Sequence, residues 1–116
     1  MRIIDLAVIP STTLDRFESH EARHARIADM RADSAVGVIQ IGPKGRLGRH
    51  PATVPQLMVI TAGSGYARGE DATTIRLTVG SAVVWTQGEE HETWTEEGIV
   101  LLIIETDDPN LGVRHS

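Results

Sequence analysis

The chain is a succession of short apolar runs, each ended by glycine, proline or polar residues. Helical spacing of apolar positions is weak nearly everywhere, so this pattern favours β-strands over helices. The run 99–104 is apolar on both faces, which is typical of a strand buried within the core. Nine strands are predicted: Ile3–Val8, Arg26–Met30, Ala35–Ile41, Gln56–Thr61, Gly65–Arg68, Thr73–Leu77, Ala82–Trp85, His91–Thr95 and Ile99–Glu105.

So many short strands without a helical half predict an all-β sandwich or jelly roll. A length of 116 residues suits a single domain. Within it we expect an N-terminal strand or arm over residues 1–25, a barrel core over 26–105 and a tail over 106–116. The polar tail is interpreted as irregular surface chain.

Composition limits the expected partners and compartment. A formal net charge of −5 and a pI near 5.4 argue against a nucleic-acid or anionic-membrane partner. The absence of cysteine excludes disulfides and fits a reducing compartment. The first ten residues are too short and too charged for a signal peptide, and no segment approaches membrane-spanning length. We therefore expect a cytoplasmic protein.

The segment 80–95 carries a recognisable motif. Gly80, Thr86, Gly88, His91 and Thr95 have the spacing G-x5-T-x-G-x2-H-x3-T. This resembles the second signature of the cupin family, G-x5-P-x-G-x2-H-x3-N, with threonine in place of proline and of asparagine. The resemblance implies a single-domain jelly-roll β-barrel. It also implies that the histidine lies inside the barrel, where cupins use it as a metal ligand.

An upstream segment is similar to the first cupin signature, G-x5-H-x-H-x(3,4)-E-x6-G. His50 matches its first histidine and Gly63 its closing glycine, whereas Ala52 replaces the second histidine and Gln56 the glutamate. The resemblance therefore implies a reduced metal-ligand set: His50, Gln56 and His91. Without the carboxylate the charge of a divalent ion stays uncompensated, so metal affinity should be lower than in the complete set.

Residues near this set in the predicted strands are candidates for a substrate pocket. The strand 56–61 places alternate residues on one face, and Thr93 shares a face with His91. Each candidate also has a simpler interpretation: a histidine bonded to backbone, a core tryptophan, or an amide that satisfies a buried backbone group. The predicted pocket residues are Met58, Ile60, Tyr66, Val83, Trp85, Thr93 and Leu102.

A second histidine motif is unrelated to the cupin signatures. His20-Glu-Ala-Arg-His24 fits the H-E-x-x-H pattern of zinc proteases. The surrounding residues lack the apolar stripe that a buried active-site helix needs, so we do not assign protease activity.

Two functional hypotheses remain. In the first, the chain binds a divalent transition metal (Zn, Ni, Fe, Mn or Cu) and a small organic acid or enol, and the resemblance implies oxygenase, isomerase, cyclase or lyase chemistry. The alternative is a metal-free ligand-binding or sensing module; catalytic residues are assigned in neither. Small single-barrel cupins are commonly dimers, so a homodimer is expected, in which segment 3–8 either pairs with the neighbour or closes its own sheet.

Overall fold

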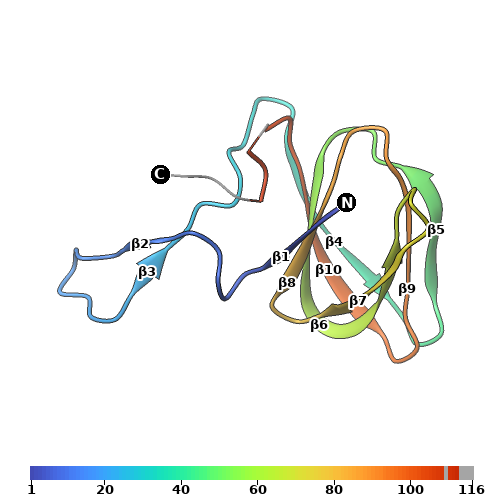
Figure 1. The fold of residues 1–116 in the computed structure, drawn as a ribbon, viewed down its shortest axis with the longest axis horizontal. Helices are drawn as coiled ribbons and strands as arrows, with labels where there is room; N and C mark the ends of the chain where they lie inside the picture. Colours follow the sequence, from blue (N-terminus) through green and yellow to red (C-terminus); the bar gives the residue numbers. More distant parts are fainter. Residues whose placement is uncertain (109, 113–116) are drawn as a thin grey trace.

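The computed structural model describes residues 1–108 and 110–112. Within these ranges the chain forms strands and no helix (Figure 1). The predicted all-β jelly roll is therefore confirmed. The strands are β1 (Arg2–Asp5), β2 (Thr12–Thr13), β3 (Arg23–His24), β4 (Ala35–Ile41), β5 (Arg46–Pro51), β6 (Gln56–Arg68), β7 (Thr74–Thr78), β8 (Ser81–Trp85), β9 (Glu90–Trp94) and β10 (Ile99–Glu105).

The barrel is built from two antiparallel layers that share one long strand. The first layer has the order β1-β8-β6-β10-β4, and the second is formed where β6 pairs with β7 and β9, and β9 with β5. β6 belongs to both because it bends midway, at Gly63 (φ +74°). Figure 1 shows the two layers closing around a common interior. No helix among the described residues has the length and apolarity needed to span a bilayer.

The predicted strands differ from the structure in several places. The segment between the predicted strands Gln56–Thr61 and Gly65–Arg68 is the bend inside β6, so these two predicted strands are one. β5 was not predicted, because Gly48 and Pro51 have low strand propensity and the strand depends on its pairing with β9. The predicted strand Arg26–Met30 is wrong; only an isolated bridge at Arg26 is present there.

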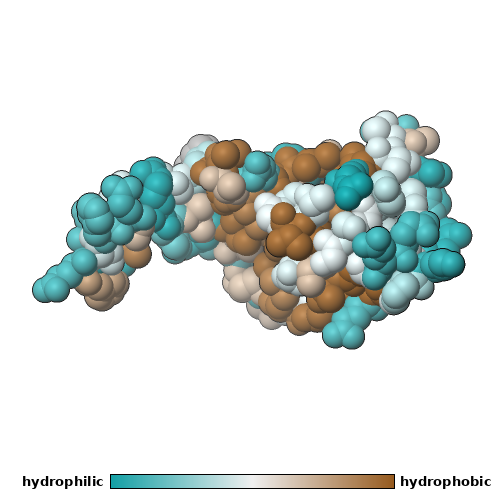
Figure 2. All heavy atoms as spheres, turned by 90° about the horizontal axis from the view of Figure 1, so that it is seen from below, coloured by the Kyte–Doolittle hydropathy of each residue, from teal (hydrophilic) through white to brown (hydrophobic). Residues whose placement is uncertain are grey.

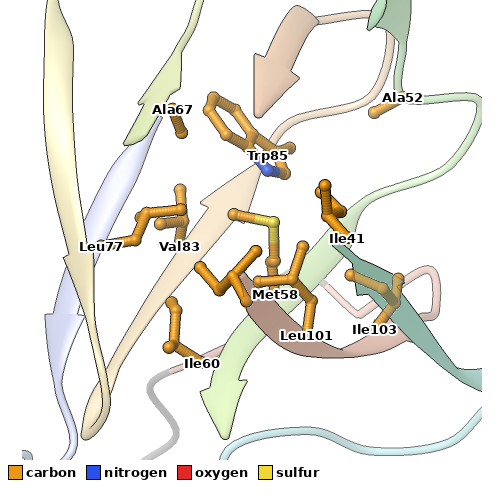
Figure 3. Close-up of a cluster of buried hydrophobic side chains, with 11 residues drawn as sticks. Ile41, Ala52, Met58, Ile60, Ala67, Leu77, Val83, Trp85, Leu101 and Ile103 are labelled. Atoms are coloured by element: carbon orange, nitrogen blue, oxygen red, sulfur yellow. The ribbon is translucent and has the colours of Figure 1, made fainter. Parts of the chain in front are cut away.

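Buried side chains form two clusters, one inside the barrel and one on the outer face of the first layer. The inner cluster fills the barrel around Trp85 and Met58 (Figure 3). The outer cluster lies on the opposite face of the same strands, because both faces of β6, β8 and β10 are apolar. Its buried members are Ile4, Leu57, Val59, Ala82, Val84 and Leu111.

The N-terminal region partly covers the outer cluster and then leaves the barrel. Leu6 and Ile27 pack against that cluster, whereas the short hairpin β2–β3 projects away from the barrel (Figure 1). Figure 2 shows hydrophobic residues gathered over the part of the barrel nearer the projection, and hydrophilic ones over most of the projection and over the far end of the barrel. The H-E-x-x-H segment is part of the hairpin, not of a helix.

The tail beyond β10 is not simply surface chain. Thr106, Asp108 and Leu111 are at most 3% exposed. The Thr106 hydroxyl donates to the Asp29 carbonyl at 3.0 Å, and Leu111 packs in the outer cluster. Polar composition suggested exposure here, but these polar groups are buried because they hydrogen-bond to the incoming N-terminal segment. Residues 109 and 113–116 of the predicted tail lie outside the described residues.

Candidate functional site

His50 and His91 lie opposite each other in the second layer of the barrel. They are register partners in the antiparallel pair β5–β9. Their ring centroids are 4.4 Å apart and their planes are tilted by 55°. His91 is buried and His50 is half-buried. The structure thus brings together the two histidines that the sequence motifs single out.

A β-bulge turns His50 toward the interior. Leu47 pairs with Thr93, but His50 pairs with His91, so β5 takes three steps where β9 takes two. In a regular strand, residues three positions apart lie on opposite faces, so without a bulge His50 would point outward if Leu47 points inward. Leu47 packs against the inner cluster. The bulge at Gly48-Arg49 therefore lets His50 point inward as Leu47 does.

Both imidazoles are held in the same tautomer. Nδ1 of His50 lies 2.7 Å from the Gly48 carbonyl oxygen, and Nδ1 of His91 lies 3.0 Å from that of Glu89. Since a carbonyl oxygen only accepts, each neutral ring carries its proton on Nδ1 and donates it. Each Nε2 then keeps its lone pair. This is the tautomer in which Nε2 binds a metal ion or accepts a hydrogen bond from a ligand.

The burial of His91 favours its neutral form. Burial lowers the pKa of His91, and the neighbouring His50 lowers it further. The carbonyl and carboxylate of Glu89 and the carboxylate of Glu90 act in the opposite direction but do not reverse the shift. Nε2 of His91 is therefore available as an acceptor at neutral pH.

The Glu89 side chain fixes the loop that positions His91. Its carboxylate accepts hydrogen bonds from the Thr86 amide (3.0 Å) and the Met1 amino group (2.8 Å). Burial alone would raise the pKa of Glu89, but these hydrogen bonds and the charge of the amino group outweigh it and lower the pKa. The Ala52 amide donates to the Glu89 carbonyl at 3.0 Å. Sequence reasoning missed this role of Glu89, because its partners are backbone N–H groups and an amino group, which leave no pattern among the side chains.

Two buried polar atoms beside the histidines have no hydrogen-bond partner among the described residues: Nε1 of Trp85 and Oγ1 of Thr93. Both residues are 0% exposed. The Trp85 indole stacks on the His91 ring, with centroids 4.6 Å apart, and its nitrogen faces the interior of the cluster in Figure 3. Since buried polar groups are nearly always paired, these two atoms mark positions that suit a bound ligand or water.

The remaining inward candidates lie close to this group. Met58, Ile60 and Val83 belong with Trp85 to the inner cluster (Figure 3). Gln56 is half-buried at the start of β6, directly opposite Trp85 in the register. Its register places it on the inward side of the sheet. Of these two paired residues, Trp85 contacts the His91 ring through its indole.

The pocket predictions for Tyr66 and Leu102 are corrected, because both side chains lie on the outside of the barrel. Tyr66 alternates with the buried Gly65 and Ala67, and it stacks on Trp94 of the neighbouring strand. Leu102 pairs with Val59 and packs against the outer cluster. The strand β10 is apolar on both faces, so hydrophobicity alone could not assign Leu102 to a face.

The histidine pair fits part of a metal coordination shell. Two imidazoles that bind one ion through Nε2 at about 2.1 Å hold their centroids roughly 4.6–5.3 Å apart for ligand angles of about 90–109°, and the 4.4 Å observed here lies just below that range. However, no group of three or more His, Cys, Asp or Glu side chains within the described ranges is arranged to hold an ion. Ala52, fully buried, occupies the place of the second motif histidine.

Comparison with known proteins supports the fold. No protein-family model matches the chain, and no curated protein matches it either. Among solved structures, a cupin-2 domain containing protein from Shewanella frigidimarina is 20% identical, with a TM-score of 0.57 over 78% of this chain and 84% of that chain. A cupin-like protein from Thermotoga maritima is 22% identical, with a TM-score of 0.61 over 70% of this chain and 66% of that chain.

A second Thermotoga maritima structure, named as a predicted oxalate decarboxylase, is 15% identical, with a TM-score of 0.54 over 60% of this chain and 62% of that chain. The shared architecture defines a jelly-roll β-barrel of the cupin type. This chain therefore has the cupin fold, as its two motifs predicted.

Proposed function

We propose that the chain is a small-molecule-binding protein whose ligand binds inside the barrel at the His50–His91 pair. The observation that carries this proposal is the shared tautomer, which leaves two Nε2 lone pairs on rings 4.4 Å apart. The unpartnered Nε1 of Trp85 and Oγ1 of Thr93 add hydrogen-bond donors to the same interior. A small organic acid or enol, which has oxygen acceptors for these donors, matches this arrangement.

We further infer that the pair holds a divalent transition metal ion, with Gln56 as the remaining candidate ligand. Two neutral imidazoles and a neutral amide leave the charge of the ion uncompensated, which favours an anionic ligand. The bound ion would supply a Lewis acid for a coordinated oxygen. Structural similarity to the protein named as a predicted oxalate decarboxylase supports a small acid as the ligand class.

A metal-free binding module is the second candidate. It is favoured by the buried Ala52 in the place of a metal-binding histidine and by the reduced set of metal donors among the described residues. In this case both Nε2 atoms accept hydrogen bonds from the ligand, and the Trp85 and Thr93 donors bind its oxygen atoms. The two candidate functions therefore use the same interior atoms and differ in whether a metal ion is bound.

Elemental analysis of protein purified without a histidine tag tests the metal. We expect bound metal in the wild type, its loss in His91→Asn, and no change in His24→Asn, which removes an exposed imidazole from the projecting hairpin. Undiminished metal in His91→Asn would overturn the metal site. Thermal shifts with small organic acids, measured with and without a chelator, separate the candidates: a shift that survives the chelator supports metal-free binding. Absence of any shift would contradict both.

We also propose that the protein is a homodimer. In this structure β1 pairs with β8 of its own chain, so the N-terminal strand closes its own sheet. The outer face of β4 remains open: Val36 and Val38 are 59% and 60% exposed. A second copy that covers this face would bury them. Light scattering should give a dimer mass for the wild type and a monomer for Val38→Asp.

The control for the dimer is Val79→Asp, which changes an equally exposed valine in the turn between β7 and β8. This variant should keep the dimer mass. A monomeric wild type, or dimers that persist in Val38→Asp, would contradict an interface on β4.

A further inference from the structure

The outward face of the second layer carries a row of aromatic and basic side chains that the barrel interior does not use. The strand registers align Arg76, Tyr66, Trp94 and Arg46 in one cross-strand row. Tyr66 and Trp94 stack with their centroids 5.9 Å apart and their planes 25° from parallel. The row is thus aromatic in the middle and cationic at both ends.

A surface groove of about 500 Å³ lies beside Trp94. It is formed where the β4–β5 turn and the β9–β10 turn approach the outward face of β9. We call it the Trp94 groove. Its charged and aromatic lining residues are Lys44, Arg46, Arg68, Glu92, Trp94 and Glu96. Three cations against two carboxylates make this groove locally basic on a chain whose net charge is −5.

The positive charge of the Trp94 groove is not neutralised by the ion pairs within it. One carboxylate, that of Glu92, pairs with Arg46 at 3.1 Å and with Arg68 at 3.5 Å. Lys44 and Glu96 complete the charged lining, so three cations face two carboxylates and one positive charge is left over. The two arginine side chains remain 68% and 41% exposed, so each retains N–H groups that face solvent.

The Trp94 ring also holds Arg68 in place. Its guanidinium carbon lies 5.2 Å from the centre of the Trp94 ring. The aromatic ring and the Glu92 carboxylate together restrict the guanidinium. A restricted, planar set of donors loses little conformational entropy when it binds an oxyanion, which is the arrangement that favours arginine over lysine for this task.

We propose that the Trp94 groove binds a phosphate oxyanion, either free phosphate or the phosphate group of a small organic compound. Arg46 and Arg68 supply paired N–H donors, and Lys44 supplies a further charge from the β4–β5 turn. Glu92 keeps the two guanidinium groups at the groove. A bound phosphate group brings the negative charge that compensates this excess. This site is independent of the proposed ligand at His50 and His91.

Isothermal titration calorimetry at low ionic strength tests this proposal with three probes: inorganic phosphate, adenosine monophosphate and adenosine. We expect saturable binding of at least one phosphate-bearing probe and none of adenosine. Lys44→Met and Arg68→Met should each weaken binding by roughly tenfold, the effect of losing a charge-assisted contact. Arg76→Met removes the same charge from the same face but outside the groove, and should weaken binding by less than about twofold.

Each outcome decides the question. Equal binding of phosphate and adenosine monophosphate identifies the free anion as the ligand, and tighter binding of the nucleotide identifies an organic carrier. Absence of saturable binding, equal weakening by Arg76→Met, or binding of adenosine as tight as that of its phosphate would overturn the proposal. If His91→Asn removed the binding, the anion would lie in the barrel, which would overturn the Trp94 groove but support the proposed interior site.

Discussion

Trp85 and His91 stack face to face inside the barrel, with ring centroids 4.6 Å apart and planes 17° from parallel. The indole comes from β8 in the first layer and the imidazole from β9 in the second. This contact therefore joins the two layers at the point where the interior polar atoms lie. Core packing and the candidate site are coupled here, since the same ring that fills the core also orients the histidine.

Truncation of Trp85 should have a large effect on stability. Trp85→Ala leaves a cavity in the inner cluster and removes the stack, which should lower the free energy of unfolding by about 3–5 kcal/mol. Trp85→Phe keeps an aromatic ring against His91 but removes Nε1, so it should lose less stability while weakening ligand binding inside the barrel. Urea denaturation and thermal-shift titration measure the two effects. A stability loss in Trp85→Ala below about 1 kcal/mol would contradict this role of the ring.

The stability of the protein should decrease as the pH falls below about 6.5, the ordinary pKa of histidine. Burial lowers the pKa of His91 in the folded state. Between the folded and unfolded pKa values the unfolded chain binds more protons, so acidification favours unfolding, and this contribution is fully present only above the unfolded value. The slope from this one group cannot exceed about 1.4 kcal/mol per pH unit.

Urea midpoints measured from pH 8 to pH 5.5 check this dependence on His91. His91→Asn should flatten the profile over that range. His24→Asn, an exposed position in the β2–β3 hairpin, should keep the wild-type slope. A wild-type slope that persisted in His91→Asn would assign the effect to other groups.

The strands that the sequence predicts correctly are those with continuous apolar runs and clear turn residues at their ends. β4 and β10 match their predicted bounds, and Gly42-Pro43 and Gly98 mark where they end or begin. β6 was divided because Gly63 and Gly65 indicate a turn when only neighbouring residues are considered. The bend at Gly63 is imposed by pairing with both layers, which local propensity does not contain.

The candidate site was likewise predictable from the sequence only in part. Motif spacing correctly brought His50 and His91 together. It could not show that their Nδ1 atoms are bonded to carbonyl groups or that Trp85 stacks on His91, since these depend on backbone positions in three strands. The face of Leu102 was also beyond prediction, because an all-apolar strand has no periodicity that distinguishes its inside from its outside.

Gly63 should not tolerate a side chain. It has a φ of +74°, and an added Cβ would lie 2.1 Å from the Gly98 carbonyl oxygen. Gly63→Ala should therefore lower the free energy of unfolding by at least about 2 kcal/mol, from backbone strain and the steric clash. Gly37→Ala is the control, because a Cβ there meets no atom within 4 Å. Equal urea midpoints for the two variants would contradict a structural requirement for glycine at the bend.

Shortening β5 by two residues at the bulge should abolish the site while leaving the fold intact. Deletion of both Gly48 and Arg49 makes Leu47 and His50 adjacent in β5, so alternation turns either Leu47 or His50 outward. Leu47 packs against the inner cluster, and its apolar side chain is costly to expose, so the structure favours retention of Leu47 inside and rotation of His50 to the surface. We therefore expect a folded protein that has lost its interior ligand and metal binding.

Circular dichroism would report retention of the strands, and elemental analysis with thermal-shift titration would report the loss of binding. His50→Asn provides the matched comparison, since it removes the imidazole without altering the register. The two variants should lose binding to the same extent, because in both the Nε2 of His91 lacks its partner in the barrel. Full binding in the deletion variant would mean that binding does not need an inward His50, and the paired-histidine site would then have to be abandoned.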